Sequence, residues 1–195
     1  MPESYSYRDF VGMTAKTDAR GVSESYGYDG LGRLSEVHDN DGILGKELSY
    51  LFATAGGGTG ADNSVRTTEY NYGNTGNAIA KTTVSHLDGL GRPVQETIVG
   101  GGGDGGDIIT RKEYDLVGRE LRNLVPAPSS AFDPSATERW TENEYEASPR
   151  DRILSVTGPG QAWRAAGKKV STEMFTNGSA AGPAELRHQG FTVAL

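Results

Sequence analysis

The chain has 195 residues, 19 of them basic and 26 acidic, which gives a formal net charge of −7 at pH 7, and it contains no cysteine. Because the lysines and arginines are scattered through an acidic chain, a nucleic-acid-binding face is excluded. The lack of cysteine excludes disulfides and thiolate metal sites. No apolar run has the length of a membrane span, and the N-terminal residues lack the pattern of a signal peptide.

In the first part of the chain, residues 1–55, aspartate and glycine recur together at regular intervals. Three Asp-x-x-Gly sequences begin at Asp18, Asp29 and Asp39. The segments between them are short and rich in Tyr, Val, Ser or Leu, and they cover residues 22–28, 33–38 and 43–52. Turns at intervals of about ten residues are typical of an antiparallel meander, so this region is predicted to form β-hairpins.

One detail of the predicted strand at residues 33–38 conflicts with regular alternation. Leu34 and Val37 are three residues apart, so a regular strand would place them on opposite faces of the sheet. A β-bulge after Gly32 would remove the conflict, because one extra residue shifts the following side chains to the other face.

Residues 56–64 are predicted to form a Gly-rich loop, and residues 65–125 a second set of hairpins. The strands expected in this set cover residues 65–72, 78–87, 92–99, 108–114 and 119–125. A turn is expected at residues 73–76, and a second Gly-rich loop at residues 100–106 is expected to be mobile because of its composition.

The composition changes after Pro126, and residues 126–195 are predicted to be irregular and β-structured. The sequence at 135–145 is the best helix candidate, with Ser135 as N-cap and Glu138 completing a capping box. Strands are expected at residues 151–156 and 169–175, and the tail at 177–183 is expected to be weakly ordered.

One pattern occurs three times, at residues 28–33, 87–92 and 114–119: Tyr or Leu, then Asp, two variable residues, Gly and Arg. Aspartate favours the first position of a type I turn, where its carboxylate accepts from backbone N–H groups. The glycine can adopt a positive φ and close the hairpin. The predicted structural turn residues are Asp29, Gly32, Arg33, Asp88, Gly91, Arg92, Asp115, Gly118 and Arg119.

The side chains that remain allow two interpretations each. The three turn arginines either bind anions or pair with the turn aspartates, and their repetition favours the structural pairing. The aromatic residues either line a sugar-binding face or pack against cross-strand neighbours, and packing is the commoner role in strands. These aromatic candidates are Tyr26, Tyr28, Tyr114, Trp140 and Trp163.

The repeated pattern resembles the YD repeats of RHS proteins, which are bacterial polymorphic-toxin shells related to toxin-complex C components and teneurins. Residues 7–50 resemble the ordinary repeat region, and residues 84–177 resemble a segment of gut-bacterial RHS proteins. The resemblance implies hairpins joined side by side into a long sheet that spirals into a hollow shell, often around a toxic C-terminal domain. It also implies a scaffold or encapsulating role, with no catalysis by the repeats themselves.

We therefore expect an all-β fold, an antiparallel hairpin-repeat sheet that is curved or open, with at most one short helix. The expected function is that of a structural segment of an RHS-type shell around or beside a toxin or effector domain; the alternative is an extracellular carbohydrate-binding module. The expected partners are the remainder of the shell, a toxin domain or a cell-surface glycan. As part of a larger protein, the chain is expected to be secreted or displayed at the cell surface.

The motifs that would indicate a cofactor, a metal site or a catalytic group do not support an enzyme. Residues 100–105 match GxGxxG, but a predicted strand follows where a dinucleotide site needs a helix. Residues 102–107 match part of a calcium-binding nonapeptide, and residues 57–62 match its first half. A Ca²⁺ site of this kind needs tandem copies, and these two are separated by a hairpin, so a plain Gly-rich loop is favoured. The three histidines are far apart in the sequence and lack the spacing of a metal site. The sequence also has no Gly-x-Ser-x-Gly motif, which would indicate a serine nucleophile.

Overall fold

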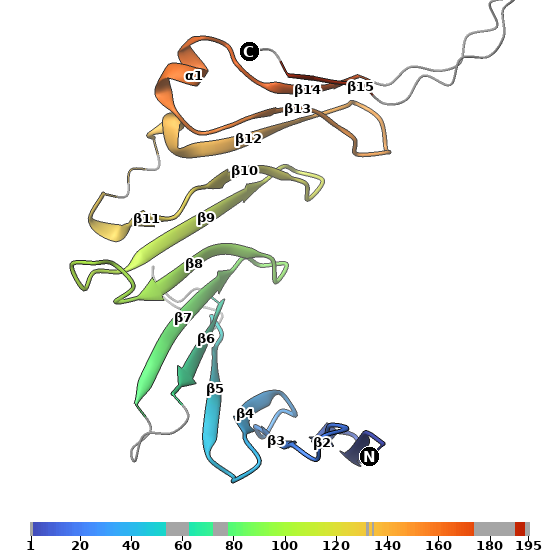
Figure 1. Cartoon of the computed structure of the whole chain (residues 1–195). Helices are drawn as coiled ribbons and strands as arrows, with labels where there is room; N and C mark the ends of the chain where they lie inside the picture. The colour runs from blue at the N-terminus through green and yellow to red at the C-terminus, as the bar shows by residue number, and fades with distance from the viewer. Residues whose placement is uncertain are drawn as a thin grey trace, which may run out of the picture. The chain divides into compact units, whose positions relative to one another are not determined.

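The computed structural model describes residues 2–53, 63–71, 78–131, 133, 135–173 and 190–193. Among these residues most strand pairs run antiparallel, and the only α-helix is α1 (Gln161–Ala165) (Figure 1). The prediction of an all-β hairpin fold with at most one short helix is therefore confirmed. No helix of the described residues is long and apolar enough to cross a membrane.

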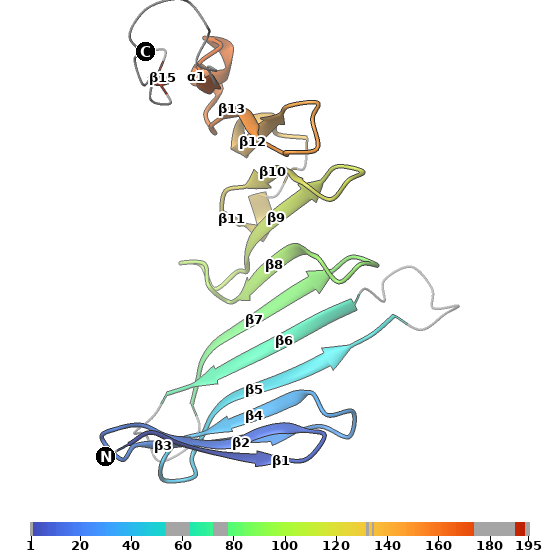
Figure 2. The same ribbon diagram turned by 90° about the vertical axis from the view of Figure 1, so that its right-hand side faces the viewer.

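The chain divides into two compact units. The first contains Met1–Ile109 with Pro128–Ser130, and the second contains Thr110–Ala127 with Ala131–Leu195. In the first unit eight strands lie side by side in sequence order, as the lower part of Figure 2 shows. They are β1 (Ser4–Arg8), β2 (Gly12–Thr17), β3 (Ser23–Tyr28), β4 (Leu34–His38), β5 (Leu44–Leu51), β6 (Asn63–Tyr70), β7 (Ile79–Leu87) and β8 (Pro93–Val99).

The second unit has the same kind of sheet. Its strands follow one another in the order β9, β10, β12, β13, β14, β15. They are β9 (Ile108–Tyr114), most of which lies in this unit, β10 (Glu120–Leu124), β12 (Trp140–Tyr145), β13 (Ile153–Thr157), β14 (Val170–Glu173) and β15 (Gly190–Val193). Between β10 and β12 lie the two-residue β11 (Ala127–Pro128) and two 3₁₀ turns, η1 (Ser129–Ala131) and η2 (Thr137–Arg139).

A β-bulge recurs near the start of the second strand of the hairpins. In the β3–β4 hairpin Tyr28 pairs with Leu34 and Gly27 pairs with Glu36, so Ser35 is left out of the ladder. The bulge expected after Gly32 is therefore present. It lets Leu34 and Val37 face the same side, because they pair with Tyr28 and Tyr26, which are two residues apart. Equivalent bulges leave out Thr14, Val94, Leu121 and Leu154.

The helix expected at residues 135–145 is wrong. Residues Thr137–Arg139 form a 3₁₀ turn, and Trp140–Tyr145 is the strand β12, paired with β10 on one side and β13 on the other. Ser135 does not cap a helix, because both its backbone N–H and its hydroxyl donate to Asp133. The ladder on both sides of β12 and the burial of Trp140 outweigh the local helix signal.

Other expectations differ in smaller ways. Asn63 and Ser64, expected in the Gly-rich loop, begin β6, and α1 forms where only a connection was expected. The turn at residues 73–76, the motif at 57–62 and the tail at 177–183 lie outside the described residues.

The two units differ in how much apolar surface they bury. In the second unit Leu124, Ala127 and Trp140 are buried, and Leu124 pairs with Trp140 across β10 and β12. Among the described hydrophobic residues of the first unit, only Ile109 is buried. The first unit is therefore a single-layer sheet, and it depends on its backbone ladder, its turns and its cross-strand contacts more than on a hydrophobic core.

The backbone of the β7–β8 turn gives a matched pair of variants. Gly91 has φ 79°, in the left-handed region, whereas the neighbouring Gly89 does not, and a Cβ at either position would meet open space. Gly91→Ala should therefore lower the free energy of unfolding by about 1 kcal/mol, through backbone strain alone. Gly89→Ala should leave it nearly unchanged. Urea unfolding followed by circular dichroism measures both, and equal losses would contradict the assigned turn.

Candidate functional site: the Asp-x-x-Gly-Arg turns

The turn at residues 29–33 shows why the motif needs each of its residues. The Asp29 N–H donates to the Arg33 carbonyl at 2.8 Å, and the Gly32 N–H donates back to the Asp29 carbonyl at 3.0 Å. The Asp29 carboxylate oxygen Oδ1 accepts from the N–H groups of Leu31 and Arg33, at 2.9 and 3.0 Å. Gly32 has φ 77°, a conformation that an L side chain rarely adopts.

The same four bonds recur in the turns that begin at Asp88 and Asp115. They also recur at Asp18 and Asp39, where no arginine follows the glycine. The aspartate therefore holds the backbone of the turn by itself, and the arginine adds a further interaction.

Each turn arginine binds the carboxylate oxygen that the backbone leaves open. The Nε atoms of Arg33, Arg92 and Arg119 lie 2.7, 2.7 and 2.6 Å from Oδ2 of the aspartate four residues earlier. Oδ1 serves the backbone and Oδ2 serves the guanidinium, so these bonds use both carboxylate oxygens. The structure thus brings the nine predicted turn residues together in three separate sets of three.

Arg33 and Arg119 also stack on aromatic rings of the following hairpin. The guanidinium of Arg33 lies 4.4 Å from the ring centre of Tyr50 and 4.8 Å from that of Phe52. The guanidinium of Arg119 lies 4.6 Å from the ring centre of Tyr145, and its Nη1 also contacts Asp151 at 3.1 Å. Such cation–π contacts connect a turn to its neighbour as well as to its own strands.

Tyrosine hydroxyls make a second connection between neighbouring hairpins, which the sequence reading missed. Tyr28 donates to the Met13 carbonyl at 2.6 Å, Tyr50 to the Leu34 carbonyl at 2.8 Å, and Tyr145 to the Glu120 carbonyl at 2.9 Å. Each acceptor is the residue immediately before a bulged residue. We call this contact, a tyrosine hydroxyl on the carbonyl that precedes a bulge, a tyrosine joint.

The tyrosine joints lie where the backbone ladder between hairpins stops. The β2–β3 ladder ends at the pair Ala15–Ser25, short of Met13 and Tyr28. The Cβ that a side chain at Gly12 would carry lies 3.1 Å from the Tyr28 hydroxyl, so Gly12 leaves space for the tyrosine. A tyrosine joint therefore satisfies a carbonyl that the interrupted ladder leaves without its strand partner. In the sequence its only signal is the similar spacing of Tyr7, Tyr28 and Tyr50, which are 21 and 22 residues apart.

The hydrogen bonds of the turns stabilise the charged form of their aspartates. The pKa of Asp29 is lowered by the Arg33 side chain and then by the backbone N–H of Arg33. The pKa of Asp88 is lowered by the backbone N–H of Arg92, against partial burial. Burial raises the pKa of Asp115, but the N–H groups and guanidinium of Arg119 outweigh it, so the net shift is downward.

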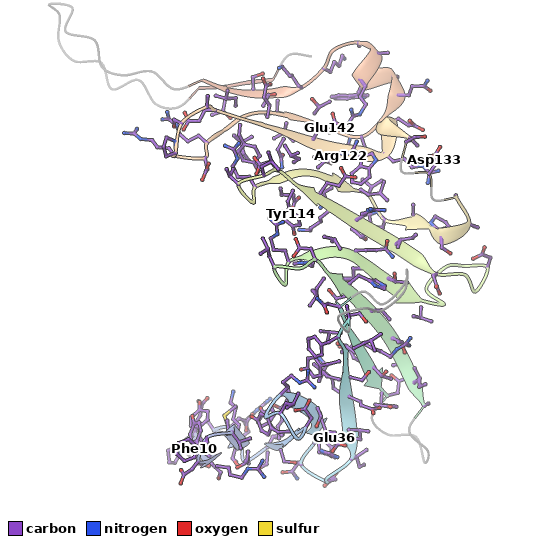
Figure 3. All side chains as sticks on the ribbon, turned by 180° about the vertical axis from the view of Figure 1, so that it is seen from behind. Phe10, Glu36, Tyr114, Arg122, Asp133 and Glu142 are labelled. Atoms are coloured by element: carbon purple, nitrogen blue, oxygen red, sulfur yellow. The ribbon has the colours of Figure 1, made fainter. Side chains whose placement is uncertain are left out.

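The second unit carries further ion pairs on its strands. Arg122 of β10 contacts Glu113 at 2.7 Å, pairs in register with Glu142 of β12, and stacks 4.5 Å from the ring centre of Trp140 (Figure 3). Hydrogen bonds from the Arg152 side chain, and to a lesser extent from the Ser148 hydroxyl, lower the pKa of the Glu146 carboxyl to about 2.

The Gly-rich segment at 100–106 forms another turn of the same hydrogen-bonding pattern. The Gly102 N–H donates to the Gly106 carbonyl, the Gly105 N–H donates to the Gly102 carbonyl, and Gly105 has φ 79°. The Asp104 and Asp107 carboxylates accept from the N–H groups of Gly106 and Gly100. Among the described residues no cluster of His, Asp and Glu fits a metal ion. The mobility of this segment stays a prediction.

The aromatic candidates have separate environments. Trp140 is fully buried, so it cannot contribute to an exposed sugar-binding face. Burial, and then the bond from its hydroxyl to Glu24, raise the pKa of Tyr26 to about 12. Trp163 is half exposed on α1, with the Lys168 ammonium 5.1 Å from its ring centre.

The lowered pKa values of the turn aspartates predict acid sensitivity. A carboxyl group whose pKa is lower in the folded state stabilises the fold above its unfolded pKa, near 4, and this stabilisation is lost as the pH falls through the folded value. The melting temperature of Asp88→Asn should therefore lie below that of the wild type at pH 7, and the two should converge toward pH 2. Asp9→Asn, at an exposed position, controls for net charge. Parallel curves for Asp88→Asn and the wild type would contradict the turn assignment.

Comparisons with known families agree with this geometry. The RHS Repeat family matches residues 12–43, which include the turns at Asp18, Asp29 and Asp39. A family described as Domain of unknown function (DUF6443), associated with RHS/YD proteins, matches residues 61–176, more than half of the chain. A search of curated proteins gives no match. The chain therefore belongs to the DUF6443 family and is an RHS/YD-repeat protein.

Proposed function

We propose that the chain is a non-catalytic structural segment of an RHS-type β-shell that lies around or beside a toxin or effector domain. The observation that carries the proposal is the repetition of one construction. The Asp-x-x-Gly turn, the bulge and the tyrosine joint recur along the chain, and each contact binds a hairpin to itself or to the next one. A repeat of this kind extends a sheet without any further chemistry.

The polar groups of the repeats support the non-catalytic part of the proposal. A general acid or nucleophile needs a reactive group directed at a substrate. In the turns, both oxygens of Asp29, Asp88 and Asp115 accept hydrogen bonds from their own turn, and the arginines that bind them are four residues away. The turn carboxylates therefore serve the fold.

The two ends of the first unit differ in a way that supports contact with another body. The turns at one end, between β1 and β2, β3 and β4, and β7 and β8, expose Phe10, Leu31 and Leu90. The turns at the opposite end carry Arg20 and Asp41 at the position that corresponds to Leu31. Val22 and Ile43 are also exposed at the opposite end, next to the turn glycines, so the two ends differ only at the turn tips. Apolar turn tips suit a surface that meets the rest of a shell or its enclosed domain.

The alternative, a carbohydrate-binding module, has less support. Sugar recognition needs aromatic rings gathered on one exposed face. Here Trp140 is buried, and the ring of Trp163 is already in contact with the Lys168 ammonium. RHS proteins are generally extracellular or at the cell surface, and we propose the same location for this chain as part of a larger protein.

The test uses the full gene product that contains this sequence. Cryo-electron microscopy is expected to show the strands of this chain in a ladder that continues into neighbouring hairpins and faces another domain. In the same protein, Gly91→Val should increase protease cleavage of the enclosed domain, whereas Gly89→Val should not, because only Gly91 has a positive φ. A freely folded chain that binds polysaccharides saturably would support the alternative instead.

A further inference from the structure

The sequence contains Asp-Gly bonds at Asp29, Asp41, Asp88 and Asp104, and all of them lie in turns. An Asp-Gly bond is open to an attack that other sequences hinder, because glycine has no side chain beside its backbone nitrogen. That nitrogen can attack the carboxyl carbon of the aspartate, which gives a succinimide and then isoaspartate. The reaction therefore depends on what holds the carboxyl group and the glycine N–H in each turn.

The turns that begin at Asp29 and Asp88 hold their carboxyl groups with three donors each. Two backbone N–H groups donate to Oδ1, and the arginine Nε donates to Oδ2. The Arg33 side chain lowers the pKa of Asp29, and the Arg92 backbone N–H lowers the pKa of Asp88. Because a carboxyl group must be protonated to lose water, these contacts protect both Asp-Gly bonds.

Asp41 occupies the third position of the turn that begins at Asp39, and the turn does not use its side chain. The Asp41 backbone N–H donates to the Asp39 carboxylate at 3.0 Å. Among the residues that the structure describes, no group donates to the Asp41 carboxylate, and the residue is exposed. The Gly42 N–H donates to the Asp39 carbonyl at 3.0 Å, so one hydrogen bond has to open before the Gly42 nitrogen can attack.

Asp104 is an intermediate case. Its carboxylate accepts one hydrogen bond, from the Gly106 N–H at 3.0 Å, and the Gly105 N–H donates to the Gly102 carbonyl at 2.9 Å. Two bonds therefore have to open at Asp104, compared with one at Asp41 and three at Asp29 and Asp88.

We propose that Asp41–Gly42 is a modification site, at which the folded chain converts spontaneously to isoaspartate. In the first step the Gly42 nitrogen bonds to the carboxyl carbon of Asp41, and the nitrogen's proton and the carboxyl hydroxyl leave together as water. In the second step one water molecule opens the succinimide ring at the α-carbonyl of Asp41. The product has the original composition, but the chain now runs through the former side chain and is longer by one methylene group.

The longer backbone alters the turn that closes β4 and β5. The inserted methylene lies between Asp41 and the two residues that follow it, Gly42 and Ile43. These residues donate to the Asp39 carbonyl and carboxylate, at 3.0 and 2.8 Å. The modification therefore moves both donors away from Asp39 and loosens the hairpin.

The four Asp-Gly bonds are controls for one another within one protein. The full chain is incubated at about pH 5, near the ordinary pKa of an aspartate, so that free carboxyl groups are partly protonated. A second sample is incubated in guanidinium chloride, where the turns are absent and only the sequence acts. Mass spectrometry of proteolytic peptides, with fragmentation that distinguishes aspartate from isoaspartate, follows each bond over time.

In the native chain, isoaspartate should form at Asp41 about tenfold faster than at Asp29 and Asp88, because each added hydrogen bond reduces the reactive population several-fold. Asp104 should react at an intermediate rate, and in guanidinium chloride the four rates should become similar. Asp41→Ser should abolish the product at this bond only. In the isoaspartate fraction, the amide protons of Gly42 and Ile43 should exchange faster with solvent than in the unmodified chain.

Equal native rates at Asp41 and Asp88 would overturn the inference, because the carboxylate contacts would then give no protection. A native chain that stays unmodified at Asp41, while the sample in guanidinium chloride reacts there, would overturn it as well. Unchanged amide exchange at Gly42 and Ile43 in the isoaspartate fraction would contradict the loosening of the hairpin. Each of these results leaves the proposed shell function untouched, because that function does not depend on Asp41.

Discussion

The structure depends on one interaction, the acceptance of backbone N–H groups by the carboxylate of a turn aspartate. A five-residue turn leaves N–H groups at its third and fifth positions that no strand can reach, and the aspartate at the first position satisfies both. Once the turn is closed, the register of the hairpin is fixed. In the hairpins closed by the Asp29, Asp88 and Asp115 turns, a bulge follows in the second strand. The bulge in turn determines which carbonyl is left for the tyrosine of the next hairpin.

This order of dependence explains how a sheet with little buried apolar surface holds together. In the first unit the hydrophobic effect has few fully buried side chains on which to act. Its place is taken by many small local interactions: two carboxylate bonds in each turn, an arginine pair, a stacked ring and a hydroxyl on a carbonyl. The second unit adds a small core of Leu124, Ala127 and Trp140.

The features that the sequence predicts well are the local ones. Asp, Gly and Arg within five residues determine their own turn, so Asp29, Gly32 and Arg33 are readable without any knowledge of the sheet. The tyrosine joint is not readable in this way, because Tyr145 and Glu120 are 25 residues apart and meet only through strand pairing. Ser135 and Glu138 formed a local helix signal, yet two neighbouring strands and a buried site decide the conformation of Trp140. The turn at Gly102 was missed because its carboxylate, on Asp104, stands two positions later than in the other turns.

The tyrosine joints connect hairpins that follow one another in the sequence, and this has a consequence for how the chain folds. Contacts between sequence neighbours close short loops, so the entropy lost at each step of folding is small. Folding can then begin at whichever hairpin forms first and proceed outward in both directions, as in other linear repeat proteins. Gain or loss of a whole 21-residue unit would leave every remaining joint intact, so such a chain can vary in length over evolutionary time without redesign of its interior.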